Sequence, residues 1–291
     1  MTTSLTLNTG ASLPQLGLGV WQATPDEAAT AVATALRLGY RLIDTAAAYG
    51  NEDGVGRGIA ESGVDRAEVF VTTKLWLTDY DDALRGFDRS LAHLGLDYLD
   101  LYLLHWPAPA MGEVVFGAYR ALEKLHADGR IRAIGVCNYQ PDQLAQLIDA
   151  TQIVPAVNQI ELHPYFIQRD LRAANAEHGV LTQSWAPIGG SGGNGGRVGD
   201  GRRVLNEPLL AEIGAKYGKT PAQVVLRWHV QHGLSAIPKS ANPGRIAQNI
   251  DIFDFELTDA DVTAIDGLHT GQRGGNDPRE VTFDTWDITL R

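Results

Sequence analysis

This sequence lacks the features that mark secreted, membrane and nucleic-acid-binding proteins. It has one cysteine, Cys137, so an internal disulfide is excluded and a reducing compartment is favoured. No apolar run approaches the ~18 residues of a membrane-spanning helix, and the N-terminus lacks the basic segment and apolar core of a signal peptide. The net charge of −11 opposes non-specific binding to nucleic acid or an anionic membrane. We therefore expect a cytoplasmic protein that binds neither nucleic acid nor membrane.

A nucleotide fingerprint is also missing where an open α/β sheet would carry it. The first expected strand, residues 16–19, is not followed by a glycine-rich turn of that type. One literal G-x-G-x-x-G occurs at Gly190, Gly192 and Gly195, within a tract that holds eight glycines among residues 189–201. No helix opens from this tract, so we interpret the match as chance. The tract itself is typical of a mobile loop or a plain linker, and a barrel would place such a loop at its functional end.

What the sequence does contain is a core and a repeating pattern. Apolar residues make up 44% of the 291 positions and charged residues 20%. Eight apolar segments alternate with helical patterns at intervals of roughly 30 residues, as in parallel strands joined by right-handed crossovers. The expected strands cover residues 16–19, 40–43, 69–73, 98–104, 131–136, 156–160, 180–184 and 234–237. The pattern predicts an α/β fold, an eight-stranded parallel (β/α)8 barrel formed by residues 1–291 as one domain; a doubly wound open sheet is the alternative.

Capping sequences and turns mark the elements around these strands. Residues 24–27 (TPDE) and 220–223 (TPAQ) each combine an N-cap threonine, a proline at the first helical position and a residue that closes a capping box. The other expected helices lie near residues 81–94, 114–127, 141–149, 170–177 and 259–268, with one more after Asn242-Pro243. Asn8-Thr9-Gly10 predicts the turn of an N-terminal hairpin before the first strand.

Polar or aromatic residues stand at or just past the ends of seven consecutive expected strands. They are Asp44, Lys74, His105, Asn138, Gln159, Trp185 and Lys239. Active sites of parallel barrels lie at the carboxyl ends of the strands, so we expect these side chains to share one rim. The first three are 30 and 31 residues apart (74 − 44 and 105 − 74), which is the length of one repeating unit. Taken singly, a solvated lysine or a core histidine is the simpler interpretation; the joint pattern favours a site.

A metal centre is the alternative chemistry for such a rim. Asp44, His105, Glu161 and His163 are all residue types that bind metals. The histidines, however, lack a close H-x-H pair, and Lys74 would place a cation beside the metal. We therefore expect no metal, and a metal-dependent barrel hydrolase remains the less favoured alternative.

The same residues carry a family resemblance. The motifs are IDTAAAYGNE around Asp44 and Tyr49, TTKLW at Lys74, LLHWP at His105, AVNQIELHP at Gln159, and IPKS at Lys239. Over nearly its whole length the chain resembles the aldo-keto reductase superfamily, and within it most closely the bacterial diketogluconate-reductase type. The resemblance implies a barrel that binds a nicotinamide dinucleotide, usually NADPH, and reduces an aldehyde, ketone or keto-sugar. It also implies a catalytic tetrad of Asp44, Tyr49, Lys74 and His105.

The chemistry of these four residue types agrees with that role. Hydride transfer to a carbonyl leaves an alkoxide that needs a proton, and Tyr49 can act as the general acid. A free tyrosine has a pKa near ~10. A cation ~4 Å away contributes about 4 kcal/mol at an effective dielectric constant of ~20, so we expect Lys74 to lower this pKa. Asp44 would keep Lys74 charged and oriented, and His105 would polarise the carbonyl.

The resemblance also assigns the cofactor positions. They are Val20, Asp44, Cys137, Asn138, Gln159, Trp185, Ala186, Pro187, Ile188, Gly189, Lys239, Ser240, Ala241, Asn242, Arg245, Gln248 and Asn249. In this assignment Asn138 and Gln159 hold the carboxamide and Trp185 stacks on the nicotinamide. Lys239, Ser240 and Arg245 grip the adenosine phosphate, which favours NADPH over NADH. Two residues depart from the family pattern: Cys137 replaces a common serine and Gln248 a frequent glutamate.

The sequence signals for the substrate pocket are less specific than those for the cofactor. Trp21, Trp76 and Trp106, with His105, suggest an aromatic pocket for a small carbonyl compound, although tryptophans also belong in cores. By resemblance, the tail 271–291 with Phe283 and Trp286 folds over the rim and shapes that pocket. A non-catalytic protein that senses the cofactor's redox state is the remaining alternative. The sequence names neither the physiological substrate nor the oligomeric state, and a monomer is compatible with it.

Overall fold

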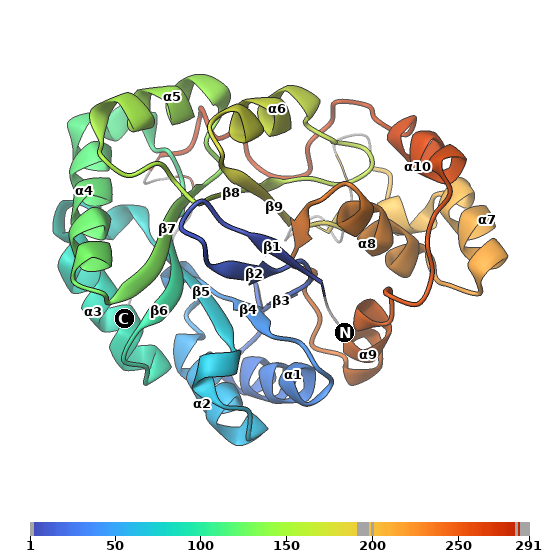
Figure 1. The fold of residues 1–291 in the computed structure, drawn as a ribbon, viewed down its shortest axis with the longest axis horizontal. Helices are drawn as coiled ribbons and strands as arrows, with labels where there is room; N and C mark the ends of the chain where they lie inside the picture. The colour runs from blue at the N-terminus through green and yellow to red at the C-terminus, as the bar shows by residue number, and fades with distance from the viewer. Residues whose placement is uncertain (1–2, 191–197, 199–200, 283–284, 286–291) are drawn as a thin grey trace.

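The computed structural model describes residues 3–190, 198, 201–282 and 285. Eight parallel strands form one sheet in the order β10-β9-β8-β7-β6-β5-β4-β3, and helices surround it (Figure 1). These strands are β3 (Leu18–Gly19), β4 (Leu42–Asp44), β5 (Phe70–Leu75), β6 (Leu99–Leu104), β7 (Ile131–Cys137), β8 (Val157–Glu161), β9 (Leu181–Trp185) and β10 (Ser235–Ala236). Single parallel bridges, Leu16 with Ala236 and Gly19 with Lys239, join the first strand to the last. The sheet thus closes on itself, and the predicted (β/α)8 barrel is confirmed.

The helices follow the predicted alternation. They are α1 (Pro25–Arg37), α2 (Glu52–Ser62), α3 (Ala83–Leu94), α4 (Glu113–Ala127), α5 (Pro141–Ala150), α6 (Arg169–Glu177), α7 (Pro208–Tyr217), α8 (Pro221–Gln231), α9 (Pro243–Ile250) and α10 (Asp259–Asp266). Short 3-10 turns are η1 (Ala47–Tyr49), η2 (Arg66–Glu68), η3 (Leu77–Asp82), η4 (Pro109–Met111) and η5 (Val204–Asn206). Both predicted capping boxes form, at Thr24 with Glu27 and at Thr220 with Gln223. None of the helices in the described part of the chain is long and apolar enough to cross a membrane.

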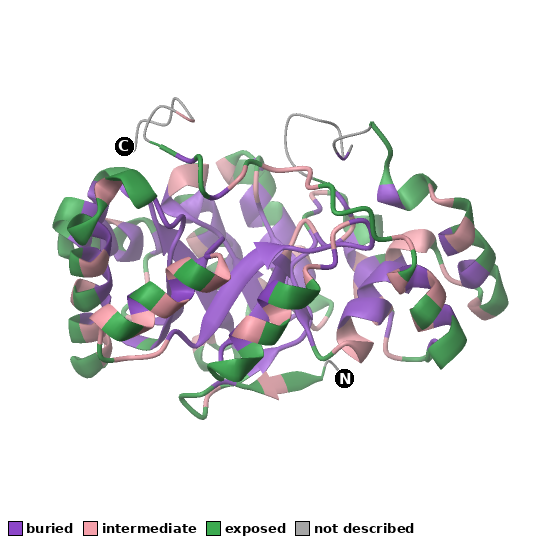
Figure 2. Cartoon of the chain, turned by 90° about the horizontal axis from the view of Figure 1, so that it is seen from above, coloured by how far each residue is buried: buried purple, intermediate pink, exposed green. Residues whose placement is uncertain are grey.

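The barrel strands are buried on both faces, as their continuous apolar runs require. Every residue of β5 and of β6 is buried, and the helices carry the exposed residues on their outer sides (Figure 2). The polar residues at the strand ends are therefore buried as well, and Lys74 is one of them.

Helix α7 was not predicted from the sequence. Its residues Leu210 and Ile213 pack with Val224 and Trp228 of α8 in a second hydrophobic cluster. Gly214 permits the tight turn between the two helices, because a Cβ there would clash with the carbonyl oxygen of Lys219. The helical pattern of α7 is short, contains a glycine and follows a glycine-rich tract, so the sequence did not predict a helix there.

The N-terminal hairpin, β1 (Ser4–Thr6) with β2 (Ser12–Pro14), covers one end of the barrel (Figure 1). Asn8 Nδ2 donates to the carbonyl of Pro155 at 3.1 Å, just before β8. Gln15 Nε2 donates to the carbonyl of Leu234 at 3.3 Å, just before β10. The hairpin therefore closes the amino ends of the strands, and the opposite rim is left for the site.

The C-terminal segment crosses that opposite rim, as predicted. The Thr270 N–H donates to the carbonyl of Tyr165 at 2.9 Å. Further on, both guanidinium nitrogens of Arg279 donate to the carboxylate of Asp142, at 2.9 and 2.7 Å, and Val281 joins the main core. Phe283, Trp286 and most of the glycine-rich tract 189–201 lie outside the described residues.

Candidate active site

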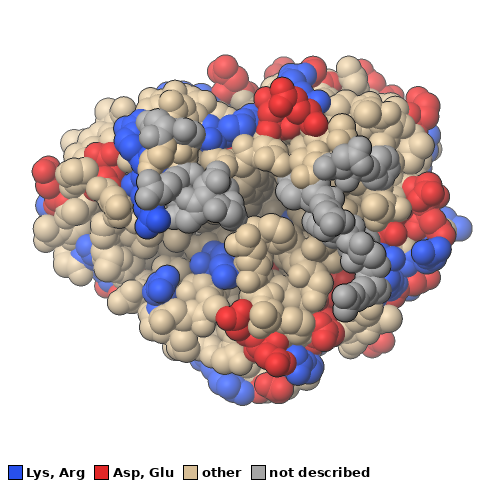
Figure 3. Space-filling model, turned by 180° about the vertical axis from the view of Figure 1, so that it is seen from behind, with Lys and Arg blue, Asp and Glu red and all other residues tan. Residues whose placement is uncertain are grey.

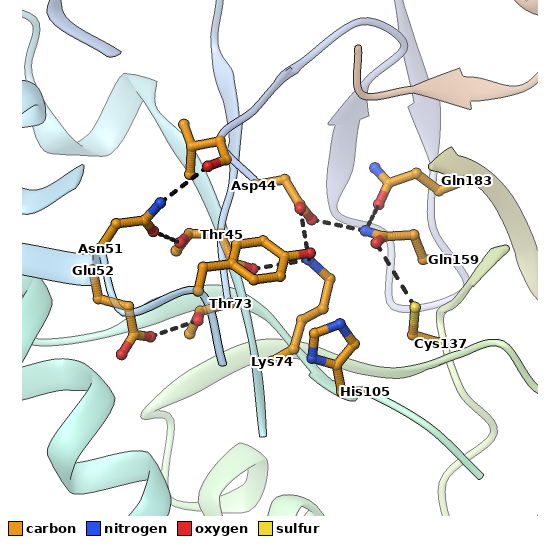
Figure 4. Close-up of polar contacts among 12 residues, drawn as sticks. Asp44, Thr45, Asn51, Glu52, Thr73, Lys74, His105, Cys137, Gln159 and Gln183 are labelled. Atoms are coloured by element: carbon orange, nitrogen blue, oxygen red, sulfur yellow. Dashed lines mark hydrogen bonds and ion pairs between the residues drawn. The ribbon is translucent and has the colours of Figure 1, made fainter. Parts of the chain in front are cut away.

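Four side chains from three neighbouring strand ends meet at the carboxyl rim, and Figure 4 labels three of them, Asp44, Lys74 and His105. Asp44 ends β4, Lys74 belongs to β5, His105 follows β6, and Tyr49 ends the η1 turn after β4. Lys74 Nζ lies 2.6 Å from Asp44 Oδ1 and 3.4 Å from the Tyr49 hydroxyl. The rings of Tyr49 and His105 are 5.7 Å apart, edge to face. The structure thus brings together all four residues expected from the sequence.

The Lys74–Asp44 pair is buried and fully hydrogen-bonded. Lys74 is 0% exposed and Asp44 2%. Lys74 also donates to the Thr45 carbonyl at 2.8 Å. Asp44 Oδ2 accepts from Gln159 Nε2 at 2.7 Å. Burying an ion pair is costly unless such bonds satisfy both partners, so this pair holds one fixed arrangement.

The electrostatics set the charge of each group. Burial alone lowers the pKa of Lys74, but Asp44 raises it, and the net direction is upward, so Lys74 is charged. Burial, helped by the Lys74 charge, holds the pKa of His105 well below its usual value, so His105 is neutral.

Tyr49 departs from the sequence-based expectation. Although its ring is partly exposed, burial among its neighbours raises its pKa to about 12, and the lowering by Lys74 is the smaller effect. The sign of the Lys74 effect was predicted correctly, but the net direction was wrong, because sequence reasoning started from a solvated phenol. In this structure Tyr49 keeps its proton.

A polar chain behind Asp44 was not found from the sequence. Gln159 Nε2 donates to Asp44 and also to Gln183 Oε1 at 2.7 Å. Gln183 Nε2 in turn donates to Ser235 Oγ at 3.1 Å. Gln183 and Ser235 are buried polar residues of strands β9 and β10, and a polar residue in an expected buried strand was the available signal. The chain fixes Gln159 and, through it, Asp44.

Asn51 is a second residue that sequence reasoning left unassigned. It is 0% exposed, and its Oδ1 accepts from Thr45 Oγ1 at 2.8 Å (Figure 4). Its Nδ2 donates to the carbonyls of Val20 and Ala23, both at 3.0 Å. Asn51 therefore ties the loop that carries Trp21 to the loop that carries Tyr49.

Three tryptophans surround the tetrad. The Trp21 ring lies 4.7 Å from the Tyr49 ring, and the Trp76 ring 5.2 Å from the His105 ring. Trp106 stacks near His105 at 6.4 Å. Seen from the side opposite the hairpin, this face of the molecule is hollowed near its middle, and basic side chains lie at the hollow (Figure 3). The sequence-predicted substrate residues therefore line one region.

The arrangement has a counterpart among known proteins. The model of the family described as "Aldo/keto reductase family" matches residues 13–270. This chain belongs to the aldo/keto reductase family. It is therefore an oxidoreductase, and its reaction at the general level is carbonyl reduction.

Curated relatives and solved structures cover almost the whole enzyme. Morphine 6-dehydrogenase of Pseudomonas putida is 54% identical over 281 residues, which is 95% of each chain. Methylglyoxal reductase DkgA of Escherichia coli (strain K12) is 48% identical over 276 residues, or 95% of this chain and 97% of the relative. A Gox0644 mutant solved in complex with NADPH is 44% identical, with a TM-score of 0.89, over 97% of this chain and 100% of that chain. The Bombyx mori aldo-keto reductase in complex with NADP is 36% identical, with a TM-score of 0.86, over 95% of each chain.

The residues that the sequence predicts at the nicotinamide of this aldo-keto reductase are compatible with a flat amide-bearing ring. Trp185 Nε1 donates to Asn138 Oδ1 at 2.8 Å, which fixes the indole. Asn138 Nδ2 donates to the His105 carbonyl at 3.1 Å. Gln159 Nε2 already donates to Asp44 and Gln183. The Oε1 atom of Gln159 accepts, among the described residues, only from the Cys137 thiol, at 3.8 Å. A carboxamide N–H would therefore find an acceptor on Gln159.

The residues predicted to bind the adenosine phosphate lie at and before α9. Lys239, four residues before α9, and Arg245, in the first turn of α9, are exposed cations. Asn242 caps this helix by accepting from the Arg245 N–H at 3.0 Å, and Ser240 Oγ accepts from the Asn242 N–H at 3.2 Å. A helix N-terminus flanked by two cations suits a phosphate. Among the other predicted cofactor positions, Ala186–Gly189 form the turn after β9, while Ala241, Gln248 and Asn249 border or belong to α9.

Two further predictions concern Cys137 and the metal alternative. Cys137 is buried beside Asn138 Nδ2, 3.2 Å from its sulfur, and burial raises the pKa of this thiol. No group of three or more His, Cys, Asp or Glu side chains in the described ranges could hold a metal ion. Glu161 and His163 instead contact each other.

Proposed function

We propose that this enzyme reduces a small-molecule carbonyl compound to an alcohol, with Tyr49 as the proton donor. It is an aldo-keto reductase, and its cofactor is NADP(H). The observation that carries the proposal is the position of the Lys74 ammonium, 2.6 Å from Asp44 and 3.4 Å from the Tyr49 hydroxyl. NADPH, when bound, supplies the hydride.

Tyr49 transfers its proton to the oxygen that becomes negative during reduction. Lys74 stabilises the phenolate that is left, because its charge is held in a buried site where electrostatic interactions are strong. Asp44 and the Thr45 carbonyl take two of the three Lys74 hydrogens and leave the third directed to the phenol. The high pKa of Tyr49 keeps the acid protonated until the substrate needs it.

His105 orients and polarises the carbonyl. Its low pKa keeps the imidazole neutral, so it gives one N–H to the substrate oxygen without adding a competing acid. Trp21, Trp76 and Trp106 form the apolar wall that holds the rest of the substrate and excludes water.

Residues along the rim from Trp185 to α9 would hold the cofactor. Trp185 supports the nicotinamide, and Asn138 and Gln159 orient its carboxamide. Lys239, Ser240 and Arg245 bind the 2′-phosphate, which gives the preference for NADPH over NADH. Val20, Cys137, residues 186–189 and 241–242, Gln248 and Asn249 complete this site. We also propose that residues 1–291 form one domain of a cytoplasmic enzyme.

The substrate class follows from the pocket and from the relatives. Two relatives are named for morphine and methylglyoxal, compounds of very different size. We therefore propose an aldehyde, ketone or keto-sugar as substrate rather than one named compound.

The test is an NADPH-oxidation assay with methylglyoxal and with a bulky ketone. We expect NADPH consumption that matches alcohol formation for at least one of them. NADPH binding without turnover on either would contradict the proposal and would indicate a cofactor-sensing protein instead.

A further inference from the structure

Glu161, the last residue of β8, makes a set of contacts that the proposed reaction does not use. Its side chain is buried, 2% exposed. Its Oε1 accepts from the Gly274 N–H at 2.6 Å, and its Oε2 accepts from the Gly275 N–H at 3.0 Å. His163 Nε2 lies 3.0 Å from Oε1. One carboxylate therefore binds two consecutive backbone N–H groups of the C-terminal segment, 113 residues further along the chain.

These contacts lie directly beside Trp185. In the β8–β9 register, Glu161 pairs with Trp185. A Cβ placed on Gly275 would come within 2.6 Å of Trp185 Cη2 and 3.2 Å of Glu161 Oε2. The backbone of Gly275 thus packs tightly against the edge of the indole ring, and only glycine leaves room for that approach. Trp185 is held at its nitrogen by Asn138 and at its far edge by this segment.

The other polar side-chain contacts of the C-terminal segment are weaker. Arg279 pairs with Asp142, but both side chains are about half exposed, at 54% and 52%. Exposed ion pairs typically contribute ~1 kcal/mol or less. Arg273 lies over the Phe166 ring, 4.9 Å from its centre. Buried charge-assisted hydrogen bonds are stronger, so Glu161 is the principal anchor of this part of the segment.

We propose that Glu161 is a positioning residue: by binding Gly274 and Gly275 it holds the C-terminal segment against Trp185 and so fixes the ring that supports the nicotinamide. The role of Trp185 rests on the proposed function. The contact between Glu161 and the two glycines does not.

Two variants approach this contact from opposite sides, with a matched control. Glu161→Gln keeps the side-chain volume, but its NH₂ group faces one of the two glycine N–H groups, so a donor meets a donor. Gly275→Ala keeps the carboxylate and adds a methyl group against Trp185. Asp142→Asn removes one carboxylate from the exposed contact of the same segment. Urea unfolding monitors the fold of each variant.

The readouts are hydrogen exchange at Gly274 and Gly275, the emission of bound NADPH, and the separate values of kcat and KM. We expect Glu161→Gln to speed exchange at both amides by about tenfold or more, the scale of a lost charged hydrogen bond. Glu161→Gln and Gly275→Ala should both change the emission of bound NADPH and lower kcat. Asp142→Asn should leave emission and kcat at wild-type values.

The outcomes separate this inference from the proposed function. Unchanged exchange in folded Glu161→Gln overturns it, and so does faster exchange with wild-type NADPH emission and kcat. If Glu161→Gln does not fold, Gly275→Ala decides by the emission alone. A wild-type chain that reduces no carbonyl, while Glu161→Gln still speeds exchange and both variants still alter emission, would refute the proposed function and support the positioning role.

Discussion

The two ends of the rim use cations in opposite ways. At β4 and β5, Lys74 is 0% exposed and is hydrogen-bonded to Asp44 and Thr45 before any substrate arrives. At α9, Lys239 and Arg245 are exposed. The buried cation is oriented in advance and can act on charge that develops during the reaction. In the proposed function the exposed cations bind a phosphate that already carries its charge, so we expect them to contribute affinity and selectivity rather than chemistry.

The same substitution, lysine to methionine, at each end should change the free energy of unfolding by very different amounts. Lys74→Met leaves Asp44 as an uncompensated buried charge, and we expect unfolding to become about 3–5 kcal/mol easier. Lys239→Met removes an exposed charge, and the expected change stays within ~0.5 kcal/mol. Urea unfolding of the two variants measures both. Similar losses would show that the two lysines are equally integrated into the fold.

The next effect concerns catalysis at the buried end. Tyr49→Phe removes the proton donor and should lower turnover by at least ~100-fold, the scale of general acid catalysis. NADPH affinity should stay nearly unchanged, because the phenol is not part of the phosphate end. Steady-state rates and a fluorescence titration measure the two quantities. Activity within a few-fold of wild type would remove Tyr49 from the mechanism.

The exposed end should show the reverse pattern. Arg245→Ala is expected to weaken NADPH binding by about 1.5–3 kcal/mol, the cost of a charged hydrogen bond, and to change NADH binding little. Turnover at saturating NADPH should remain close to wild type. Equal losses for both cofactors in a fluorescence titration would mean that Arg245 does not read the 2′-phosphate.

The C-terminal segment allows a finer separation. Deleting the residues after Asn276 leaves Gly274 and Gly275 in place. We expect the ratio of kcat/KM between a bulky and a small aldehyde to shift by roughly tenfold, about 1.4 kcal/mol of differential transition-state binding. NADPH affinity should move much less. A truncated enzyme with an unchanged substrate ranking would rule out a role for these residues in selectivity.

The smallest effect is a flat pH response. The pKa of His105 lies well below its usual value and that of Tyr49 is about 12, so neither changes charge near neutrality. Both groups stay in the form that reduction requires as the pH rises. We expect kcat for reduction to change less than about twofold between roughly pH 6 and 7.5. A steep change in a pH-rate profile over this range would show that one of the two titrates there.

The sequence allowed the barrel and the clustering of Asp44, Lys74 and His105 to be predicted because both depend on regular spacing. Asp44, Lys74 and His105 each follow an apolar strand, and a parallel barrel brings such positions to one rim. The family motifs then added Tyr49 and the cofactor residues.

Contacts between distant segments were not predicted, because they do not depend on regular spacing. No spacing connects Glu161 with Gly274, or Gln183 with Ser235, since the fold alone brings them together. The pKa of Tyr49 was misjudged because burial, which cannot be read from the motif, outweighs the nearby lysine.

The seam of the barrel has a consequence for how this chain is made. The bridges Leu16–Ala236 and Gly19–Lys239 each join residues 220 positions apart (236 − 16 and 239 − 19). The barrel therefore cannot close until residues 236–239 have emerged from the ribosome, on the order of ten seconds or more after β3 at the usual rates of synthesis. Throughout that interval the nascent sheet has two unpaired edges, and such edges template aggregation. Both edges of the nascent sheet therefore stay unpaired until the backbone hydrogen bonds of this seam form.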